Sequence, residues 1–510
     1  MHGPIALNST LRALVWALLL PVATVFVSPQ DASAAEFHAY SGAVGAKSRN
    51  DFVPLTLSEP STVRATLKWP KRKARLTLVL KPAGSKAVVK LRGKKRPKGF
   101  SYHAQPGNWW ILVRAAKGGS VYKLNVSIEP VDSWIPPPPS EPCEGVSVAP
   151  GDDIQDMMAA HPGGTTYCFA SGRYQLDEPI FPQSYDRLIA ETGAVLDGGN
   201  TVVGAVYGTG GETGQKSVTV RGFIVQNFAS SLTDPSKSAA IKAGWSWTIE
   251  WNEIRYNRSE GIRANRGVVV RNNFVHHNGK YGVVGCFADE MVWEGNEIAY
   301  NNTGDHSFGD AGASKICKSA NVVLRGNYVH HNNGHGLWAD TDNINFLYEN
   351  NLVTQNVGIG ILHETSYDAI IRDNVVRYNA ESARNKSVGY GSNILIYVSQ
   401  DVEIYGNTVE ADTNGIGLYD IARGSGAYGE WKLQNVFVHD NVVKMKGTAE
   451  TGLGGRPEAF SPQAKNRFSK NSYYITEPSG TFWYWKSSRS WSEWRAEDQD
   501  LNGSVSVWSG

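Results

Sequence analysis

Between residues 247 and 443, short runs of alternating apolar and polar positions end in one recurring phrase. Each copy has an apolar run, then two residues that are mostly polar or glycine, then an asparagine, and another apolar residue two places after the asparagine. The asparagines are Asn252, Asn273, Asn296, Asn327, Asn351, Asn374, Asn407 and Asn441. The apolar positions alternate with period two and are rich in Val and Ile, which is typical of strands. A fixed phrase that recurs every 21 to 34 residues predicts a solenoid of β-strands.

The recurring asparagines are interpreted as structural. A side-chain amide both donates and accepts hydrogen bonds, so copies at the same corner of successive coils are expected to bond to one another. The chain resembles the right-handed parallel β-helix repeats of the pectin-lyase-like superfamily over residues 143–450. The resemblance implies an all-β fold, a right-handed parallel β-helix. That superfamily includes lyases, glycoside hydrolases, epimerases and phage tailspikes, so function has to be argued from the side chains.

Residues 1–35 read as a signal peptide. Arg12 precedes the apolar run ALVWALLLPVATVFV, and Ala32, Ser33 and Ala34 supply the small residues that a signal peptidase requires. The alternative, a retained membrane anchor, is disfavoured because the run is shorter than the ~20 residues of a usual span. We therefore expect an extracellular, secreted chain with no membrane contact after cleavage.

Residues 36–130 contain short alternating runs broken by Pro, Gly and Ser, which predict a small β-sandwich. The order of strand, tryptophan, LTLVLKPAGS and GNWWILVRAAKGGSVYKLNV resembles the bacterial pre-peptidase C-terminal domain, which implies an accessory module of a secreted hydrolase. This segment holds 19 Lys+Arg against four Asp+Glu, whereas residues 131–510 hold 30 against 43. Its basic runs KWPKRKAR and KKRPK either bind an anionic polymer or form a solvated face.

The segments that border the repeats are expected to link and cap the solenoid. Residues 131–142 include IPPPPSEP and predict a stiff Pro-rich linker. The sequence VAPGDDIQDMMAAHPGG then predicts a short capped helix that covers the open end of the coils. Residues 451–510 are aromatic and irregular and are expected to lack the recurring phrase, so we expect a C-terminal cap there, with a sugar-binding appendage as the alternative.

Four cysteines accompany the predicted export, and they are expected to form two disulfides. Aligned coils place Cys286 and Cys317 at the same position on neighbouring strands, which lie ~4.8 Å apart and within bridging range. Cys143 and Cys168 would then brace the first coil. A metal site is disfavoured because no CxxC or Cys/His spacing occurs.

One strand of each coil begins near a glycine, and its alternation predicts which side chains face water. The first outward column is Lys242, Arg263, Val284, Lys315, Trp338, Leu362, Leu395 and Tyr419, and the second contains Cys286, Cys317, Asp340, Glu364 and Tyr397. Asp340 and Glu364 would therefore lie on adjacent coils, with Asp342 two residues along on the same face. Such close carboxylates raise the pKa of one of them, which gives the acid and the ionised partner that glycosidic-bond hydrolysis requires. Solvated polar residues on an exposed sheet are the alternative interpretation.

The candidate substrate-binding residues surround these carboxylates: Trp338, Lys315, Arg263, His335, His363, Tyr367 and Tyr397. Trp and Tyr offer flat surfaces for a sugar ring, and Lys and Arg offer cations. His363 falls on an inward position, so it either turns out at the strand end or is a core histidine. Lengthened turns at residues 303–312, 380–392 and 421–430 are expected to border the binding face.

Three functions fit these residues. The first is a secreted glycoside hydrolase on a polysaccharide, with Asp340 and Glu364 as the catalytic pair, Asp342 as positioning group or substitute base, and no cofactor. The second is a uronate lyase or epimerase in which Lys315 or Arg263 takes a proton and the carboxylates bind Ca²⁺. The third is a wall-binding or surface protein without catalysis. A monomer is expected, with no nucleic-acid partner.

Overall fold

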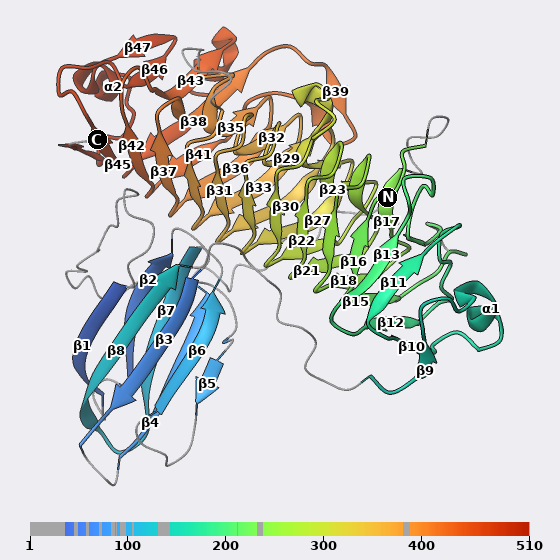
Figure 1. The fold of residues 1–510 in the computed structure, drawn as a ribbon. Coiled ribbons are helices and arrows are strands. Elements are labelled where there is room, and N and C mark those ends of the chain that lie inside the picture. The colour runs from blue at the N-terminus through green and yellow to red at the C-terminus, as the bar shows by residue number, and fades with distance from the viewer. Residues whose placement is uncertain are drawn as a thin grey trace, which may run out of the picture.

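The computed structural model describes residues 36–44, 49–57, 61–70, 74–82, 87, 89–91, 98–104, 107–130, 143–211, 213–231, 238–380 and 388–508. The predicted signal peptide and linker lie outside these residues. Two four-stranded antiparallel sheets come first, and three long parallel sheets follow (Figure 1). The all-β prediction, a right-handed parallel β-helix preceded by a small β-sandwich, is confirmed. Within the described residues, no helix is long and apolar enough to cross a membrane.

The first two sheets enclose their own apolar core, which contains Leu67, Leu78, Ile111 and Leu124. One sheet has the order β1 (Glu36–Val44), β8 (Ser120–Pro130), β3 (Ser61–Lys68) and β6 (Lys98–Ala104). The other has the order β2 (Asn50–Leu57), β7 (Gly107–Lys117), β4 (Arg75–Pro82) and β5 (Val89–Leu91).

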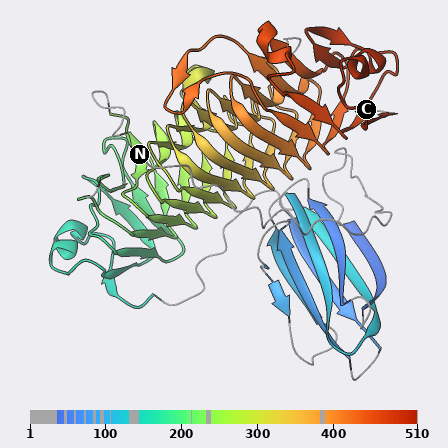
Figure 2. The ribbon, with the colours of Figure 1, turned by 180° about the vertical axis from the view of Figure 1, so that it is seen from behind.

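In the β-helix, each coil contributes one strand to each of three sheets, and the coils stack along one axis (Figure 2). The first sheet contains β9 (Val146–Val148), β10 (Thr166–Phe169), β12 (Arg187–Ala190), β15 (Thr219–Arg221), β18 (Thr248–Glu250), β21 (Val269–Arg271), β24 (Val292–Glu294), β27 (Ala320–Arg325), β30 (Ile344–Glu349), β33 (Tyr367–Arg372), β36 (Gln400–Tyr405), β41 (Phe437–His439) and β44 (Arg467–Ser469). The second contains β11 (Gly172–Gln175), β13 (Ala194–Asp197), β16 (Ile224–Gln226), β19 (Glu253–Arg255), β22 (Phe274–His276), β25 (Glu297–Ala299), β28 (Tyr328–His330), β31 (Leu352–Thr354), β34 (Val375–Arg377), β37 (Thr408–Ala411), β42 (Val442–Met445), β45 (Ser472–Ile475) and β48 (Ser504–Val507). The third contains β14 (Val206–Tyr207), β17 (Ala239–Lys242), β20 (Glu260–Ala264), β23 (Tyr281–Cys286), β26 (Gly312–Cys317), β29 (Leu337–Asp340), β32 (Ile361–Glu364), β35 (Ser392–Tyr397), β38 (Asn414–Asp420), β43 (Thr451–Gly455), β46 (Trp483–Trp485) and β47 (Ser487–Arg489).

The predicted asparagine ladder forms at the corner between the first and second sheets. Asn327, for example, accepts from both nitrogens of Asn296 and donates to the side-chain oxygen of Asn351, at 2.9–3.1 Å. A second ladder, which the sequence analysis missed, joins Asn257, Asn278, Asn301, Asn332, Asn356, Asn379 and Asn393 at the corner between the second and third sheets. Both ladders are buried, so each coil is bonded to the next through side chains as well as through strands.

The first ladder continues into the segment that was expected to lack its phrase. Asn471 accepts from the backbone and side chain of Asn441 and donates to Asp500. That expectation is wrong, because FSKN in residues 468–471 is a further copy of the phrase. Asp500 ends the row, since a carboxylate accepts and has no amide hydrogen to pass on.

Helices cover both ends of the coils. α1 (Ile154–Ala159) begins at Asp153, whose side chain accepts from the Asp156 backbone, and it buries Ile154 and Met158 in the solenoid core. The predicted capped helix is therefore present. At the other end, α2 (Trp491–Ala496) carries a capping box between Ser490 and Glu493 and buries Trp494.

Both predicted disulfides, Cys143–Cys168 and Cys286–Cys317, are confirmed. The second joins β23 to β26, where the two cysteines are direct strand neighbours with Cα atoms 4.4 Å apart.

Replacing Cys286 and Cys317 together by serine is expected to lower the free energy of unfolding by about 3–4 kcal/mol, because the unfolded chain regains the freedom of a loop with a sequence separation of 31. Denaturant unfolding with and without reductant measures the effect. An unchanged midpoint would contradict a stabilising role for this bridge.

Candidate active site

The outward face of the third sheet carries the candidate site, and its register agrees with the predicted columns. Asp340 pairs with Glu364, and Glu364 pairs with Tyr397, on adjacent coils. Lys315 lies one coil before Trp338, since Ile316 pairs with Ala339. Tyr419 is the exception: it pairs with Tyr397, so it belongs to the second column and not the first. The longer connection at residues 380–392 does not change the order of these strands in the third sheet.

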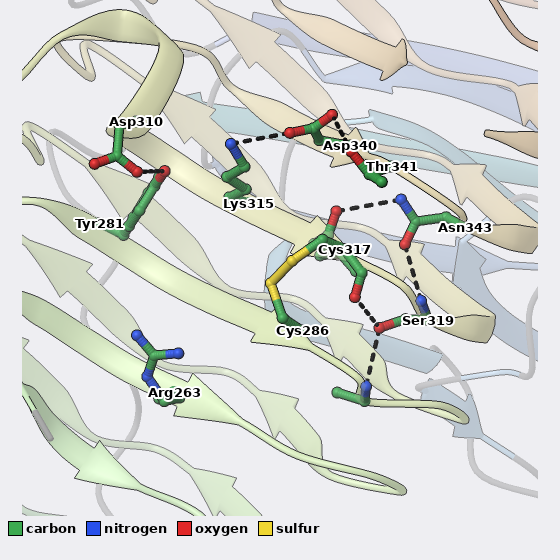
Figure 3. Close-up of a disulfide and its surroundings, with 12 residues drawn as sticks. Arg263, Tyr281, Cys286, Asp310, Lys315, Cys317, Ser319, Asp340, Thr341 and Asn343 are labelled. Atoms are coloured by element: carbon green, nitrogen blue, oxygen red, sulfur yellow. Dashed lines mark hydrogen bonds and ion pairs between the residues drawn. A yellow bond between two sulfur atoms is a disulfide. The ribbon is translucent and has the colours of Figure 1, made fainter. Parts of the chain in front are cut away.

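Asp340 lies at the end of β29, where its environment is polar and charged. Its carboxylate forms a 3.0 Å ion pair with Lys315 and accepts a 2.9 Å hydrogen bond from the Thr341 hydroxyl. Figure 3 shows Lys315 extending from β26 toward Asp340, next to the Cys286–Cys317 bridge. The disulfide thus fixes the strand that positions the lysine.

Glu364 occupies the equivalent position at the end of β32 but is more enclosed. Its carboxylate accepts a 3.2 Å hydrogen bond from the Trp338 indole nitrogen and lies 3.4 Å from Arg423. Burial raises the pKa of Glu364, the negative charge of Asp340 raises it further, and Arg423 partly opposes the shift. The two carboxylates therefore occupy unlike environments, as an acid and its ionised partner require.

Two aromatic side chains proposed as sugar platforms are covered. Trp338 is only 3% exposed and packs with Leu362, Leu395 and Val398 in a small apolar cluster on the outer surface of the sheet. The Lys315 ammonium group lies 3.8 Å from the centre of the Trp338 ring. Tyr397 is 8% exposed and stacks on Tyr419, with ring centres 5.9 Å apart. Both side chains point outward as predicted, but neighbouring side chains bury the faces of their rings. Trp338 and Tyr397 therefore position the charged groups and are not open to a ligand.

Asp342 is not on the strand with Asp340. It lies in the following turn with φ 56°, and its carboxylate accepts from the Ala427 backbone and the Trp431 indole at 3.0 and 3.2 Å. The prediction that it shares the face of β29 is therefore wrong. Tyr367 has a similar role, because its hydroxyl donates to the Gly429 carbonyl at 2.8 Å.

These bonds fasten a loop, residues 421–432, which returns from the coil of β38 to the coil of β29. It carries the hairpin of β39 (Ser425–Gly426), which is labelled in Figure 1, and β40 (Gly429–Glu430). Arg423 of this loop reaches Glu364. The loop at residues 303–312, with the short helix η3 (Phe308–Asp310), also contacts the site, because the Gly309 carbonyl accepts from Lys315. Two of the three lengthened turns therefore border the carboxylates, and Tyr390 of the third contacts Tyr397 and Tyr419.

The two histidines are structural neighbours of the site. His363 points into the core, where its ring contacts the Tyr348 hydroxyl at 3.2 Å, and burial lowers its pKa to about 4. The sequence left open whether His363 turns outward or lies in the core, and the structure places it in the core. The His335 ring accepts from the Ile359 backbone at 3.0 Å, and burial lowers its pKa to about 4, with Lys315 adding to the shift.

A second charged group, missed by the sequence analysis except for Arg263, lies one to three coils before Asp340 on the same sheet. Arg263 pairs with Glu260 of β20, and Lys280 forms a 2.8 Å pair with Asp310. The Tyr281 hydroxyl donates to Asp310 at 3.4 Å (Figure 3). The sequence did contain a signal for this group, because Glu260 and Tyr281 each directly precede the glycine near which their strand begins.

Comparison with known proteins agrees with the fold. The family described as right handed beta helix region matches residues 237–409. No curated protein sequence matches the chain. Among solved structures, the chain is similar to the catalytic domain of Agl-KA, with 11% identity, coverage of 94% of this chain and 96% of that chain, and a TM-score of 0.40. It is also similar to the A-module of mannuronan C-5 epimerase AlgE6 of Azotobacter vinelandii, with 13% identity, coverage of 70% and 94%, and a TM-score of 0.42. PfbA, a surface adhesin of Streptococcus pneumoniae, gives 13% identity, coverage of 65% and 86%, and a TM-score of 0.42. The chain is thus a right-handed parallel β-helix protein.

Proposed function

We propose that this chain is a secreted glycoside hydrolase that cleaves a polysaccharide, with Glu364 as the general acid and Asp340 as the nucleophile. The observation that carries the proposal is the pair itself: a Glu364 carboxyl whose pKa is raised by burial and by Asp340, beside an Asp340 carboxylate paired with Lys315. Two groups on adjacent parallel strands are separated by ~4.8 Å at the backbone. In retaining enzymes the two carboxyl groups are ~5–5.5 Å apart, a separation that side chains on adjacent strands can reach.

The steps follow from these positions. Glu364 donates its proton to the glycosidic oxygen as the bond between that oxygen and the anomeric carbon breaks, and an Asp340 oxygen bonds to the anomeric carbon. Glu364, now ionised, then takes a proton from water, the water oxygen attacks the anomeric carbon, and the bond to Asp340 breaks. Lys315 and the Trp338 indole position the two carboxylates.

Elimination or epimerisation of a uronate is less well supported by the contacts of the proposed bases. Lys315 is paired with Asp340 and lies against the Trp338 ring, and Arg263 is paired with Glu260. A base that removes a carbon-bound proton has to be free of such a partner when it acts. In the proposed hydrolysis, Lys315 keeps its ion pair with Asp340.

Digestion of a glycan panel tests the proposal. We expect new reducing ends without the ultraviolet absorbance of an unsaturated uronate. Unsaturated products would assign a lyase. Binding to a glycan with no product of either kind would assign a non-catalytic binding protein.

The raised pKa of Glu364 predicts a pH dependence. A general acid must be protonated in the free enzyme, so kcat/KM should fall as pH rises through the pKa of Glu364. Arg423 lowers that pKa, so Arg423→Met should move this basic limb to higher pH. Arg325→Met is the matched control, because Arg325 is also ion-paired and similarly exposed but lies on the first sheet. A basic limb at the same pH in wild type and Arg423→Met would contradict the assignment of Glu364 as the acid.

A further inference from the structure

One end of the β-sandwich gathers cations in pairs. Lys68, at the end of β3, is the direct cross-strand partner of Lys123 on β8. Arg75, at the start of β4, is the direct partner of Lys117 at the end of β7. The two pairs lie at the same end of the sandwich, since Gly118, between β7 and β8, lies against Ala74, which directly precedes β4. All four cationic side chains are exposed.

Like charges directly opposite each other on neighbouring strands destabilise a sheet. Within the described residues, no carboxylate is ion-paired with Lys68 or Lys123. Asp51 accepts a 2.6 Å hydrogen bond from the hydroxyl of Tyr122, a neighbour of Lys123 in the sequence. Two such pairs at one end of a small domain therefore oppose folding unless an anion offsets them. This arrangement indicates a binding function for the end of the sandwich.

A hollow of about 670 Å³ lies beside the opposed lysines, which both line it. Its walls are Ser41–Ala43 of β1, Lys68–Pro70 and Val121–Lys123. Of these, Val121 is 59% exposed, whereas Trp69 and Tyr122 are buried. The volume lies in the range of small-ligand sites. Exposed apolar surface flanked by two ammonium groups fits a sugar ring that carries acidic substituents.

We propose that this hollow binds an acidic polysaccharide, with Lys68 and Lys123 paired to carboxylates of the glycan and the apolar wall against its rings. The opposite charge balance of residues 131–510, with 30 basic against 43 acidic residues, repels the same polymer from the solenoid. The sandwich therefore attaches the protein to an acidic matrix, independently of what the third sheet of the β-helix cleaves.

The test uses residues 36–510 carrying Glu364→Gln, which prevents digestion during the measurement. Affinity electrophoresis in gels that contain polygalacturonate is expected to show retardation that weakens with salt, and none in gels that contain dextran. Lys68→Glu with Lys123→Glu should weaken the Kd about tenfold or more, since two exposed ion pairs become repulsions. Lys465→Glu with Lys470→Glu makes the same change in net charge on the solenoid, on exposed lysines, and should leave binding unchanged.

Three results would overturn the proposal: unaltered binding by the Lys68/Lys123 variant, equal weakening by the solenoid variant, or tighter binding of double-stranded DNA at the same concentration of anionic groups. The last result would assign a nucleic-acid surface. Thermal unfolding of the Lys68→Glu/Lys123→Glu variant should occur close to the wild-type temperature, because two like charges still lie directly opposite each other. If that variant unfolds at a lower temperature, Lys68→Gln with Lys123→Gln gives the same comparison without new charges.

Discussion

Replacing Glu364 by glutamine is expected to lower the rate of glycosidic-bond cleavage by about 10²–10⁴-fold, the usual contribution of a general acid. The amide keeps the shape of the side chain and its contact with the Trp338 indole, but it has no acidic proton to donate. Since burial and Asp340 both disfavour the Glu364 carboxylate, the variant should be at least as stable as the wild type at neutral pH. Initial rates on the active glycan and denaturant unfolding together measure the effect.

The matched control is Glu290→Gln, because Glu290 is also ion-paired but is exposed and lies outside the third sheet. Its rate should equal that of the wild type. A Glu364→Gln enzyme that retains full activity, with a lowered rate in the control, would place the reaction elsewhere on the molecule.

The second large effect is on stability. Asn327→Ala is expected to lower the free energy of unfolding by about 3–5 kcal/mol, because the change leaves buried amide groups of the neighbouring coils without partners. Asn327 is fully buried and makes two bonds from its amide, to the Trp293 carbonyl and Asn351, and accepts two from Asn296. Denaturant unfolding followed by circular dichroism measures the loss.

Asn345→Ala serves as the control, since Asn345 is exposed and bonds only to Asn321 in the neighbouring coil. It should lower the free energy of unfolding by only about 1 kcal/mol, because alanine tolerates the positive φ of this position, 57°, less well than asparagine does. Equal effects of the two substitutions would mean that the buried ladder does not hold the coils together.

The sequence was sufficient for the solenoid because the same physical requirement repeats in each coil. Alternation with period two separates core from surface, and the recurring asparagine marks one corner. The pairing of Asp340 with Glu364 and of Cys286 with Cys317 followed from that alternation. Local pattern therefore fixes the register of a parallel β-helix well.

The environment of the outward side chains was harder to predict. Alternation shows to which side of the sheet a side chain points, but it does not show whether neighbouring side chains bury it. Trp338 and Tyr397 point outward, yet the apolar cluster they form with Leu362 and Leu395 buries them. Asp342 bonds to Ala427 and Trp431, 85 and 89 residues further along the chain. A contact of that separation depends on how a loop folds back over other coils, which the local pattern does not contain.

The configuration of the first sugar product tests the central claim most directly. Proton NMR of the anomeric centre, recorded in the first minutes of digestion before mutarotation, shows whether the product keeps the configuration of the bond that was cut. Asp340 and Glu364 on adjacent coils predict retention. An inverted or unsaturated first product would contradict attack by Asp340.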